Sequence, residues 1–357
     1  MRKRLALLLV VLFVLTFSMQ AAVAAPDDAK LPSVKILATG GTIAGKGASS
    51  TQMTGYNPGA IGVQVLIDAV PELKQYANVS GEQIANIGSF AMNNEVWLTL
   101  ARRTNELLAS DDVDGIVITH GTDTLEETAY FLNLVVKSNK PVVLIGAMRP
   151  ATAMSADGPV NILNAVRLAG SKEARGKGVL VALNDQINGG RDVTKTNTTH
   201  VETFKSWELG VLGYIQNGKP YFYRESTRKH TTQSEFDITG LTKLPYVEIV
   251  YAHTNHNRLF VDAAVNAGVK GIVHAGMGHG SMYPATKEAF IDAQKKGVVV
   301  VKSSRVGNGM VTRVAEDDKL HFVAADTLNP QKARILLMMA LTKTSDPVEI
   351  QRMFDEY

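Results

Sequence analysis

Short apolar runs alternate with helical patterns along this chain, and this alternation limits the possible folds more than any other feature. Runs rich in β-branched residues lie at residues 34–38, 115–119, 141–145 and 178–182. Because nearly all of their residues are apolar, these runs are typical of parallel strands that are buried on both faces. Parallel strands need crossover connections, and the segments between the runs have helical periodicity. The sequence therefore predicts an α/β fold with a mainly parallel sheet.

One of the predicted helices begins after Asp123. Apolar residues at helical spacing share one of its faces: Leu125, Ala129, Leu132 and Val136. Thr124 and Glu127 have the spacing of a capping box, which predicts that they close the first turn of this helix.

A second, smaller α/β set follows a polar stretch that we interpret as a linker at residues 221–244. Its predicted strands cover residues 247–251, 271–274 and 297–301, and residues 330–341 have the pattern of a helix. We therefore expect a larger N-terminal α/β domain at residues 31–220 and a smaller C-terminal α/β domain at residues 245–357.

The first residues have the pattern of an export signal. Residues 2–4 are basic, residues 5–17 are apolar apart from one threonine, and residues 22–24 (Ala-Val-Ala) supply a cleavage pattern. The apolar run is shorter than the about 20 residues that a membrane-spanning helix needs. We therefore predict a signal peptide at residues 1–24 and an exported protein, either periplasmic or extracellular.

The charge balance of the mature chain argues against a basic binding surface. Of the 37 Lys and Arg residues, three belong to the predicted signal, which leaves 34 against 34 Asp and Glu residues. We therefore expect no nucleic-acid partner and, once the signal is removed, no membrane partner. The chain has no cysteine, so disulfides cannot stabilise it, and its core or an oligomer must do so.

Two glycine-rich loops follow predicted strands, at residues 39–45 and 120–124. In open α/β sheets, ligands bind where the strands end at their carboxyl edge. Each loop places a threonine, Thr42 or Thr122, directly after glycine. The plainer interpretation is that both loops are simple turns whose hydroxyl groups bind nearby backbone.

A third residue, Lys195, favours a catalytic site over the interpretation of the two loops as simple turns. A threonine hydroxyl is a poor nucleophile unless a base takes its proton. A lysine kept neutral by desolvation, acting through a second threonine and oriented by a carboxylate such as Asp123, can serve as that base. These residue types predict a nucleophilic site, and the fold decides whether they meet.

The first loop also fits the start of a phosphate-binding loop through Gly40, Gly45 and Lys46. Gly47 stands where that motif has the Ser or Thr that binds magnesium, and the glycines do not fit a dinucleotide fingerprint. We therefore expect no nucleotide cofactor.

Longer segments around these residues resemble the signature segments of type II L-asparaginases, in the asparaginase/glutaminase family. They lie at residues 36–45, 119–128, 146–150, 192–199 and 328–334, and the similarity extends from about residue 31 to residue 357. The resemblance implies hydrolysis of L-asparagine to L-aspartate and ammonia through a threonine acyl-enzyme. It also implies a homotetramer with sites shared between subunits, and neither metal nor cofactor.

The resemblance assigns catalytic roles to five residues. Thr42 matches the nucleophile, and Tyr56 matches the tyrosine of a lid that approaches it. Thr122, Asp123 and Lys195 match a second catalytic cluster.

Substrate contacts are implied in the same way. Ser89 matches the residue that binds the α-carboxylate, and Asp123 also matches the residue that binds the α-amino group. Ala147 matches a backbone contact to the amide, and Glu316 matches an acid supplied by a neighbouring subunit.

Three positions depart from the usual family pattern. Phe90 stands where a Gln or Glu usually contacts the substrate. His279 stands where an Asn of the neighbouring subunit usually reaches the site, and Ala285 replaces a hydroxyl residue nearby. We expect these changes to affect substrate preference and affinity, because the nucleophile and both catalytic clusters are intact.

Two other interpretations remain. The same motifs allow a glutaminase-asparaginase with broad amide specificity, and a periplasmic solute-binding protein would also pair two α/β domains behind a signal. A metal site is not expected, because the pairs His253/His256 and His274/His279 lack a carboxylate at ligand spacing.

Overall fold

The structure is a computed structural model, and it describes residues 30–357. The predicted signal peptide lies outside the described residues. Within them, no helix combines the length and the apolar character needed to cross a membrane.

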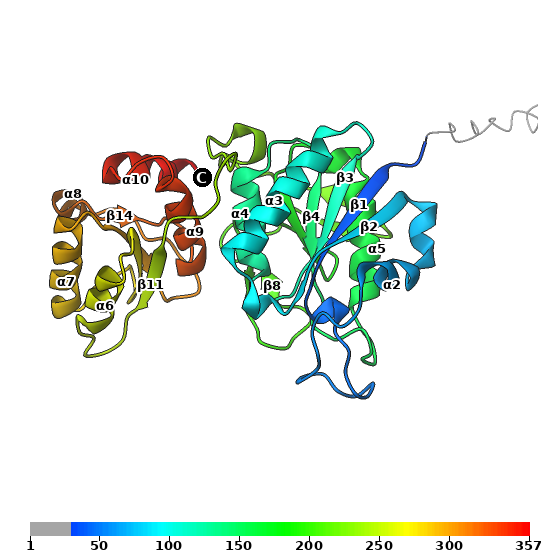
Figure 1. Ribbon diagram of the computed structural model, residues 1–357, viewed down its shortest axis with the longest axis horizontal. Coiled ribbons are helices and arrows are strands. Elements are labelled where there is room, and N and C mark those ends of the chain that lie inside the picture. The colour runs from blue at the N-terminus through cyan, green and yellow to red at the C-terminus, as the bar shows by residue number, and fades with distance from the viewer. Residues whose placement is uncertain (1–29) are drawn as a thin grey trace, which may run out of the picture. The chain divides into compact units, whose positions relative to one another are not determined.

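The larger of two main sheets has eight strands in the order β10-β9-β6-β5-β4-β3-β1-β2 (Figure 1). Its strands are β1 (Ser33–Gly40), β2 (Asn78–Ile87), β3 (Gly115–Thr119), β4 (Val142–Ile145), β5 (Val179–Leu183), β6 (Gln186–Gly189), β9 (Gly213–Gln216) and β10 (Lys219–Phe222). The first five are parallel, and β6, β9 and β10 pair antiparallel. The four apolar runs predicted as parallel strands are confirmed as β1, β3, β4 and β5.

The sequence does not predict β2, and the reason lies in its position. β2 is an edge strand that pairs only with β1, and its positions are either partly or fully exposed. A strand with one solvated edge needs no continuous apolar run, so the pattern that marks the central strands is missing there.

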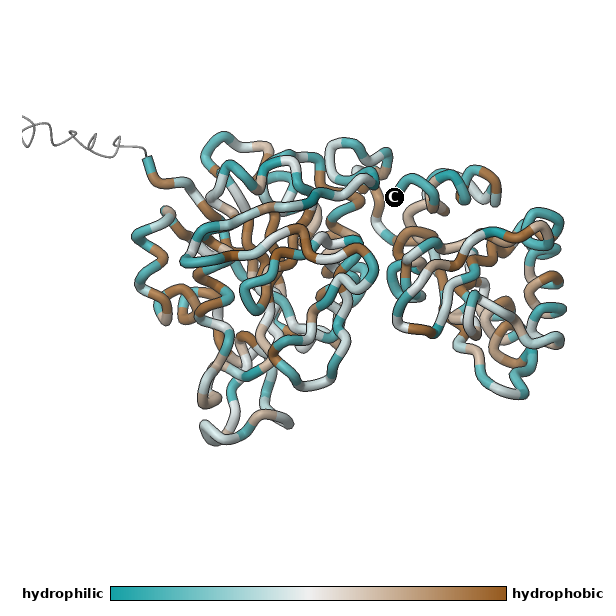
Figure 2. The backbone as a smooth tube through the Cα atoms, turned by 180° about the vertical axis from the view of Figure 1, so that it is seen from behind, coloured by the Kyte–Doolittle hydropathy of each residue, from teal (hydrophilic) through white to brown (hydrophobic). Residues whose placement is uncertain are grey.

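The smaller sheet is parallel, in the order β11-β12-β13-β14. Its strands are β11 (Val247–Tyr251), β12 (Gly271–Gly276), β13 (Val299–Ser304) and β14 (Val323–Ala324). β7 (Thr194–Lys195) and β8 (Phe204–Lys205) form a separate two-stranded antiparallel ladder. The structure thus confirms the predicted class, a mainly parallel α/β fold with a larger and a smaller sheet. Hydrophobic segments run through the interior of both α/β sets in Figure 2.

Helices cover both faces of the larger sheet. α3 and α4 lie on one face and α2 and α5 on the other, and each pair shares a buried hydrophobic cluster with the strands (Figure 1). The α-helices are α2 (Val63–Asp68), α3 (Asn94–Ala109), α4 (Leu125–Val135), α5 (Gly158–Ala169), α6 (Leu259–Asn266), α7 (Pro284–Lys295), α8 (Ala315–Leu320), α9 (Pro330–Ala340) and α10 (Pro347–Glu356). Single 3₁₀ turns are η1 (Thr42–Ala44), η2 (Pro71–Gln75), η3 (Ser89–Ala91), η4 (Lys172–Ala174) and η5 (Thr231–Gln233).

Helix α4 is buried on nearly all sides. Besides its predicted apolar face, it buries Glu126, Tyr130 and Asn133, because α9 of the second set packs against it. The predicted capping box is wrong. The Thr124 hydroxyl makes no cap and instead donates a hydrogen bond of 2.9 Å to the backbone oxygen of Ser89.

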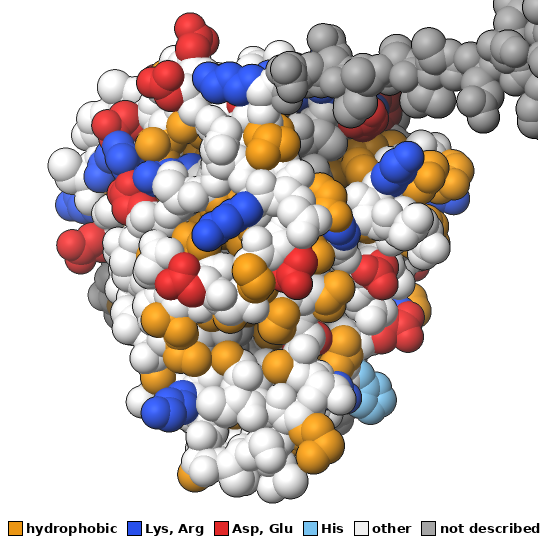
Figure 3. Space-filling view, turned by 90° about the vertical axis from the view of Figure 1, so that its right-hand side faces the viewer, with side chains coloured by type: hydrophobic (Ala, Val, Ile, Leu, Met, Phe, Trp, Pro, Cys, Tyr) orange, Lys and Arg blue, Asp and Glu red, His pale blue; other side chains and the backbone are white. Residues whose placement is uncertain are grey.

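The surface carries charges of both signs. On the face seen in Figure 3, Lys and Arg side chains lie interspersed with Asp and Glu. This mixture agrees with the equal numbers of basic and acidic residues that follow the predicted signal.

Candidate active site

The two glycine-threonine loops meet at the switch point of the larger sheet. The chain leaves β1 for β2 on one side and returns to β3 on the other side of β1. The carboxyl ends of β1 and β3 therefore border the crevice in which open α/β sheets bind ligands. Thr42 and Thr122 follow these two strands.

Glycine is required where the loops touch. A Cβ atom on Gly41 would lie 2.2 Å from the Gly121 Cα, which is closer than real Cβ contacts allow. Gly41 also has φ 81° and ψ −168°, a conformation essentially restricted to glycine. A Cβ on Gly121 would in turn lie 2.5 Å from the Ser89 Oγ. The glycines bring the loops into backbone contact and place Thr42 and Thr122, both largely buried, together in the lining of one cavity.

A cavity of about 560 Å³ opens at this point. It is lined by Gly41, Thr42, Met53, Thr54, Gly55, Tyr56, Pro58, Gly88, Ser89, Phe90, Gly121, Thr122, Asp123, Met148, Arg149, Lys195, Thr198 and Thr199. All five residues expected to be catalytic are among them. The size falls within the roughly 300–1,000 Å³ typical of small-molecule sites.

Thr42 is paired with Tyr56. The Thr42 Oγ1 lies 2.6 Å from the Tyr56 hydroxyl oxygen, and Thr42 is 8% exposed. Two backbone hydrogen bonds between Lys46 and Asn57, of 3.0 and 3.1 Å, close the loop that returns Tyr56 to Thr42. These bonds thereby hold Tyr56, which is 14 residues away in the chain, in contact with Thr42.

Thr122, Asp123 and Lys195 form a second cluster. The Lys195 Nζ donates to the Thr122 Oγ1 at 3.0 Å and to the Asp123 Oδ1 at 2.8 Å. Lys195 is mostly buried, whereas the Asp123 carboxylate is half-exposed towards the cavity. The lysine can therefore exchange a proton with the Thr122 hydroxyl while the carboxylate stabilises its charged form.

A buried hydrogen-bond chain supports the second loop. The Trp97 Nε1 donates to the Thr128 Oγ1 at 2.8 Å, and this hydroxyl lies 2.9 Å from the His120 Nε2. The His120 Nδ1 lies 2.7 Å from the Gly121 carbonyl oxygen. Burial lowers the pKa of His120 to about 4, so the ring is neutral at physiological pH. A neutral ring can donate from Nδ1 and accept at Nε2, which completes the chain.

Ser89 is fixed by the same loop. The Asp123 amide donates to the Ser89 Oγ at 3.1 Å, and the Thr124 hydroxyl binds the Ser89 carbonyl. Because the Ser89 oxygen accepts from this amide, its own proton is free for an acceptor in the cavity.

Two family models match the chain. The model described as "Asparaginase, N-terminal" matches residues 33–228, and the model described as "Glutaminase/Asparaginase C-terminal domain" matches residues 246–354. The chain belongs to the asparaginase family.

Similar members of the asparaginase family come from several bacteria. The chain is 57% identical to L-asparaginase 2 of Bacillus subtilis, over 93% of this chain and 88% of that protein. It is 55% identical to L-asparaginase 2 of Escherichia coli, over 92% and 94% of the two chains. It is also 55% identical to a glutaminase-asparaginase of Pseudomonas fluorescens, over 92% and 91%. The crystal structure of a probable cytoplasmic L-asparaginase of Campylobacter jejuni has a TM-score of 0.90 and 52% identity, covering 91% of this chain and all of that one.

Other residues named by the family resemblance are spread more widely. Ala147 is fully buried, and the Met148 and Arg149 that follow it line the cavity. Glu316 pairs with Lys287, and the His279 Nε2 accepts a hydrogen bond of 3.0 Å from the Thr312 amide. Neither Glu316 nor His279 lies in the cavity lining of its own chain.

Sequence reasoning missed some residues of this asparaginase-family site. Met53, Arg149 and Thr199 line the cavity, and Asp157 holds the loop of Arg149 by accepting from its amide at 3.0 Å. Glu126, in the first turn of α4, was also passed over. Acidic residues are favoured in the first turn of a helix and Glu127 is adjacent, so the sequence does not single out Glu126.

Proposed function

We propose that this protein hydrolyses the side-chain amide of L-asparagine to L-aspartate and ammonia, with Thr42 as nucleophile. The observation that carries the proposal is the 2.6 Å contact between the Thr42 and Tyr56 hydroxyl oxygens, in a cavity that also holds the Lys195–Thr122 pair. A nucleophile within hydrogen-bond reach of a proton acceptor is the geometry that covalent catalysis requires. Two relatives of more than half identity are named L-asparaginase 2.

The proposed acylation step uses the paired hydroxyl groups. The Thr42 Oγ attacks the side-chain carbonyl carbon, and Tyr56 relays its proton towards the amide nitrogen. The new C–O ester bond forms as the C–N bond breaks, and ammonia leaves.

The proposed deacylation step uses the second cluster. A water molecule attacks the ester, and its proton passes through the Thr122 hydroxyl to the Lys195 amine. Asp123 stabilises the resulting ammonium. The ester C–O bond to Thr42 then breaks, the proton held by Lys195 returns to the Thr42 oxygen, and aspartate leaves.

The charges at the mouth of the cavity suit an α-amino acid. The Asp123 carboxylate is half-exposed and can pair with the α-ammonium group. The free proton of the Ser89 hydroxyl can be donated to the α-carboxylate. Both groups are tied to one loop, so the amino acid would be held at a fixed distance from Thr42.

Replacement of the nucleophile tests the proposal. Thr42→Ala should lower kcat for asparagine by more than about 1,000-fold and leave the melting temperature and assembly unchanged, because only one hydroxyl is lost. Thr51→Ala, an exposed threonine of the same loop, is the matched control and should stay within about twofold of wild type. If Thr42→Ala keeps a tenth of the wild-type turnover, Thr42 is not the nucleophile.

Broad amide specificity is the second candidate. It is favoured by a relative of 55% identity that is named glutaminase-asparaginase. Steady-state ammonia release from asparagine and from glutamine by the purified protein separates the two candidates. Comparable kcat/KM values for the two amides would establish the broader activity.

We also propose export and a homotetrameric assembly. The proposal of export is supported by the basic and apolar pattern of residues 1–24 and by a 54% identical relative named a probable periplasmic L-asparaginase, from Haemophilus influenzae. The similar Campylobacter protein is named a probable cytoplasmic enzyme, so fractionation of the native host is the decisive experiment.

A further inference from the structure

We propose that Glu126 is a positioning residue for the reaction, because it fixes the main chain at Lys195 so that the lysine amine reaches Thr122 and Asp123. This inference rests on the proposed function of the site. It concerns a residue that lines no part of the cavity described above and acts only through Lys195.

The Glu126 carboxylate is buried and accepts four hydrogen bonds. Glu126 is 3% exposed. Its Oε2 accepts from the Thr194 hydroxyl and from the Lys195 amide, both at 2.6 Å. Its Oε1 accepts from the Asn329 side-chain amide at 2.9 Å and from the Gln331 side-chain amide at 2.7 Å. One carboxylate thus joins the two residues of β7 to the first turn of α9.

Lys195 is held at both of its ends by one short segment. Its amine contacts Thr122 and Asp123, and its backbone amide contacts Glu126 in the helical turn that follows. The groups that anchor the two ends of Lys195, at residues 122–123 and at Glu126, are therefore at a distance set by one loop and the first turn of α4. A shift of about 1 Å between a catalytic group and its partner can cost on the order of 100-fold in rate.

Lys195 belongs to neither of the two main sheets, so their hydrogen bonds do not fix its position. β7 has two residues and pairs only with β8, which also has two. Such a short ladder has little stability of its own, so the position of β7 depends on side-chain contacts.

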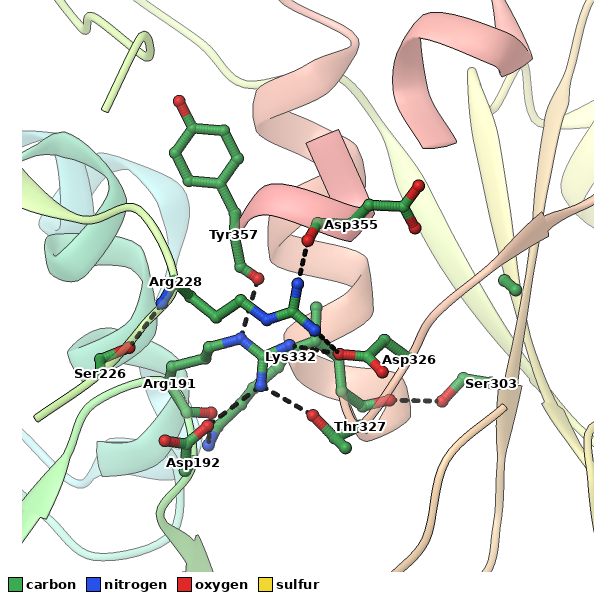
Figure 4. Close-up of polar contacts among 12 residues, drawn as sticks. Arg191, Asp192, Ser226, Arg228, Ser303, Asp326, Thr327, Lys332, Asp355 and Tyr357 are labelled. Carbon is green, nitrogen blue, oxygen red and sulfur yellow. Dashed lines mark hydrogen bonds and ion pairs between the residues drawn. The ribbon is translucent and has the colours of Figure 1, made fainter. Parts of the chain in front are cut away.

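The residues before β7 are anchored by a different cluster (Figure 4). The Arg191 guanidinium contacts Asp192, Asp326 and Thr327 at 3.0, 3.0 and 2.7 Å. The Lys332 amine donates to the Arg191 carbonyl at 2.7 Å. These contacts hold the chain up to Val193, whose carbonyl also accepts from Lys332. The next two residues, Thr194 and Lys195, are instead held by hydrogen bonds to the Glu126 carboxylate.

A double-mutant cycle tests the inference. Glu126→Ala should lower kcat for asparagine by about 30-fold or more in the wild-type background, because Lys195 loses its main-chain anchor. In a Lys195→Ala background the same change should lower the residual rate by less than about threefold, since no amine is left to position. Equal losses in both backgrounds would show a general structural role and overturn the proposal.

Two further variants sharpen the test. Glu126→Gln keeps an oxygen for the Lys195 amide, although its new NH₂ group would face the Asn329 NH₂ group, whose Oδ1 already accepts from the Lys332 amide. It should therefore lower kcat by less than Glu126→Ala does, because the main-chain contact to Lys195 remains. Glu127→Gln is the matched control, since it changes the neighbouring glutamate, whose pKa burial raises to about 7, and should stay within about twofold.

The cycle remains decisive if Glu126→Ala does not fold. Thr194→Val then replaces it, because valine keeps the shape of threonine and removes only the hydroxyl that binds Glu126. Its loss of rate should also shrink in the Lys195→Ala background, and an undiminished loss would contradict the inference. If the wild-type protein releases no ammonia from asparagine, the proposed function itself fails. An active wild type with equal losses in both backgrounds rejects only the role of Glu126.

Discussion

Phe90 is an exposed apolar residue in the cavity lining, at a position where the sequence resemblance leads us to expect a polar contact to the substrate. The side chain is 75% exposed and lines the cavity, and its ring lies against Gly88, where a Cβ would approach it to 2.4 Å. Asparagine and glutamine differ by one methylene, which a pocket alone discriminates by about 1–3 kcal/mol. A rigid apolar ring cannot follow the shift of the α-ammonium group that a longer side chain imposes, whereas a flexible polar residue could.

We expect asparagine to be strongly preferred over glutamine, and Phe90→Gln to weaken that preference. The ratio of kcat/KM for glutamine to that for asparagine should rise by about tenfold, the lower end of the discrimination for one methylene. Phe90→Leu, which stays apolar, serves as the control and should leave the ratio near that of wild type. An unchanged ratio in Phe90→Gln would show that selectivity comes from other residues.

At the scale of elements, the site depends on how closely two strand-to-helix connections approach each other. The loop after β1 supplies Thr42 and the loop after β3 supplies Thr122, and Gly41 touches Gly121 between them. Helix α4 continues the second loop and carries both the Thr128 link to His120 and the buried Glu126. A helix buried on nearly all sides cannot move independently, so these loops form a rigid floor for the cavity.

Gly41→Ala should separate the two loops. The added Cβ would collide with Gly121, and the Gly41 backbone conformation costs about 1–3 kcal/mol for a residue other than glycine. We therefore expect a fall of at least that size in the free energy of unfolding, measured in urea, together with a loss of turnover. Gly307→Ala is the control, because no atom lies within 4 Å of a Cβ built there. Wild-type stability in Gly41→Ala would mean that the loops have room to separate.

At the scale of the whole molecule, the second α/β set contributes to a site that lies on the first. Lys332, Asn329 and Gln331, at the start of α9, hold Arg191 and Glu126, and through them the chain around Lys195. Glu316 and His279 belong to the same set but lie outside the cavity lining of their own chain. A role for them at the site therefore requires a second copy of the chain.

Mixing of subunits tests that requirement. Thr42→Ala and Glu316→Ala proteins should each be nearly inactive, and refolding them together should restore about a quarter of the wild-type activity. Half of randomly formed dimers are mixed, and one of their two sites is intact. The double variant Thr42→Ala/Glu316→Ala, refolded alone, is the control and should restore nothing. The absence of recovery in a mixture shown by mass spectrometry to contain mixed dimers would mean that each site is built from one chain.

The sequence by itself determined the fold class, the central strands and the two threonine loops. Continuous apolar runs rich in β-branched residues are typical of strands buried on both faces of a parallel sheet, and glycine-threonine loops at strand ends are local features of the sequence. Edge strand β2 and the antiparallel strands β6, β9 and β10 were not predicted, because solvated or short strands need no such pattern. The capping box was wrong because a tertiary partner, Ser89, takes the Thr124 hydroxyl.

Only the tertiary structure decided which polar groups meet. Thr122 and Lys195 are 73 residues apart, and Glu126 and Gln331 are 205 residues apart, yet each pair is in hydrogen-bond contact. No local pattern specifies such contacts, since they depend on how the packing of α4 against α9 and the sheet sets the distances between side chains. The sequence identifies the residue types that can perform nucleophilic catalysis. Their separation to within a few tenths of an ångström comes from the packed core, because a close-packed interior allows few alternative arrangements.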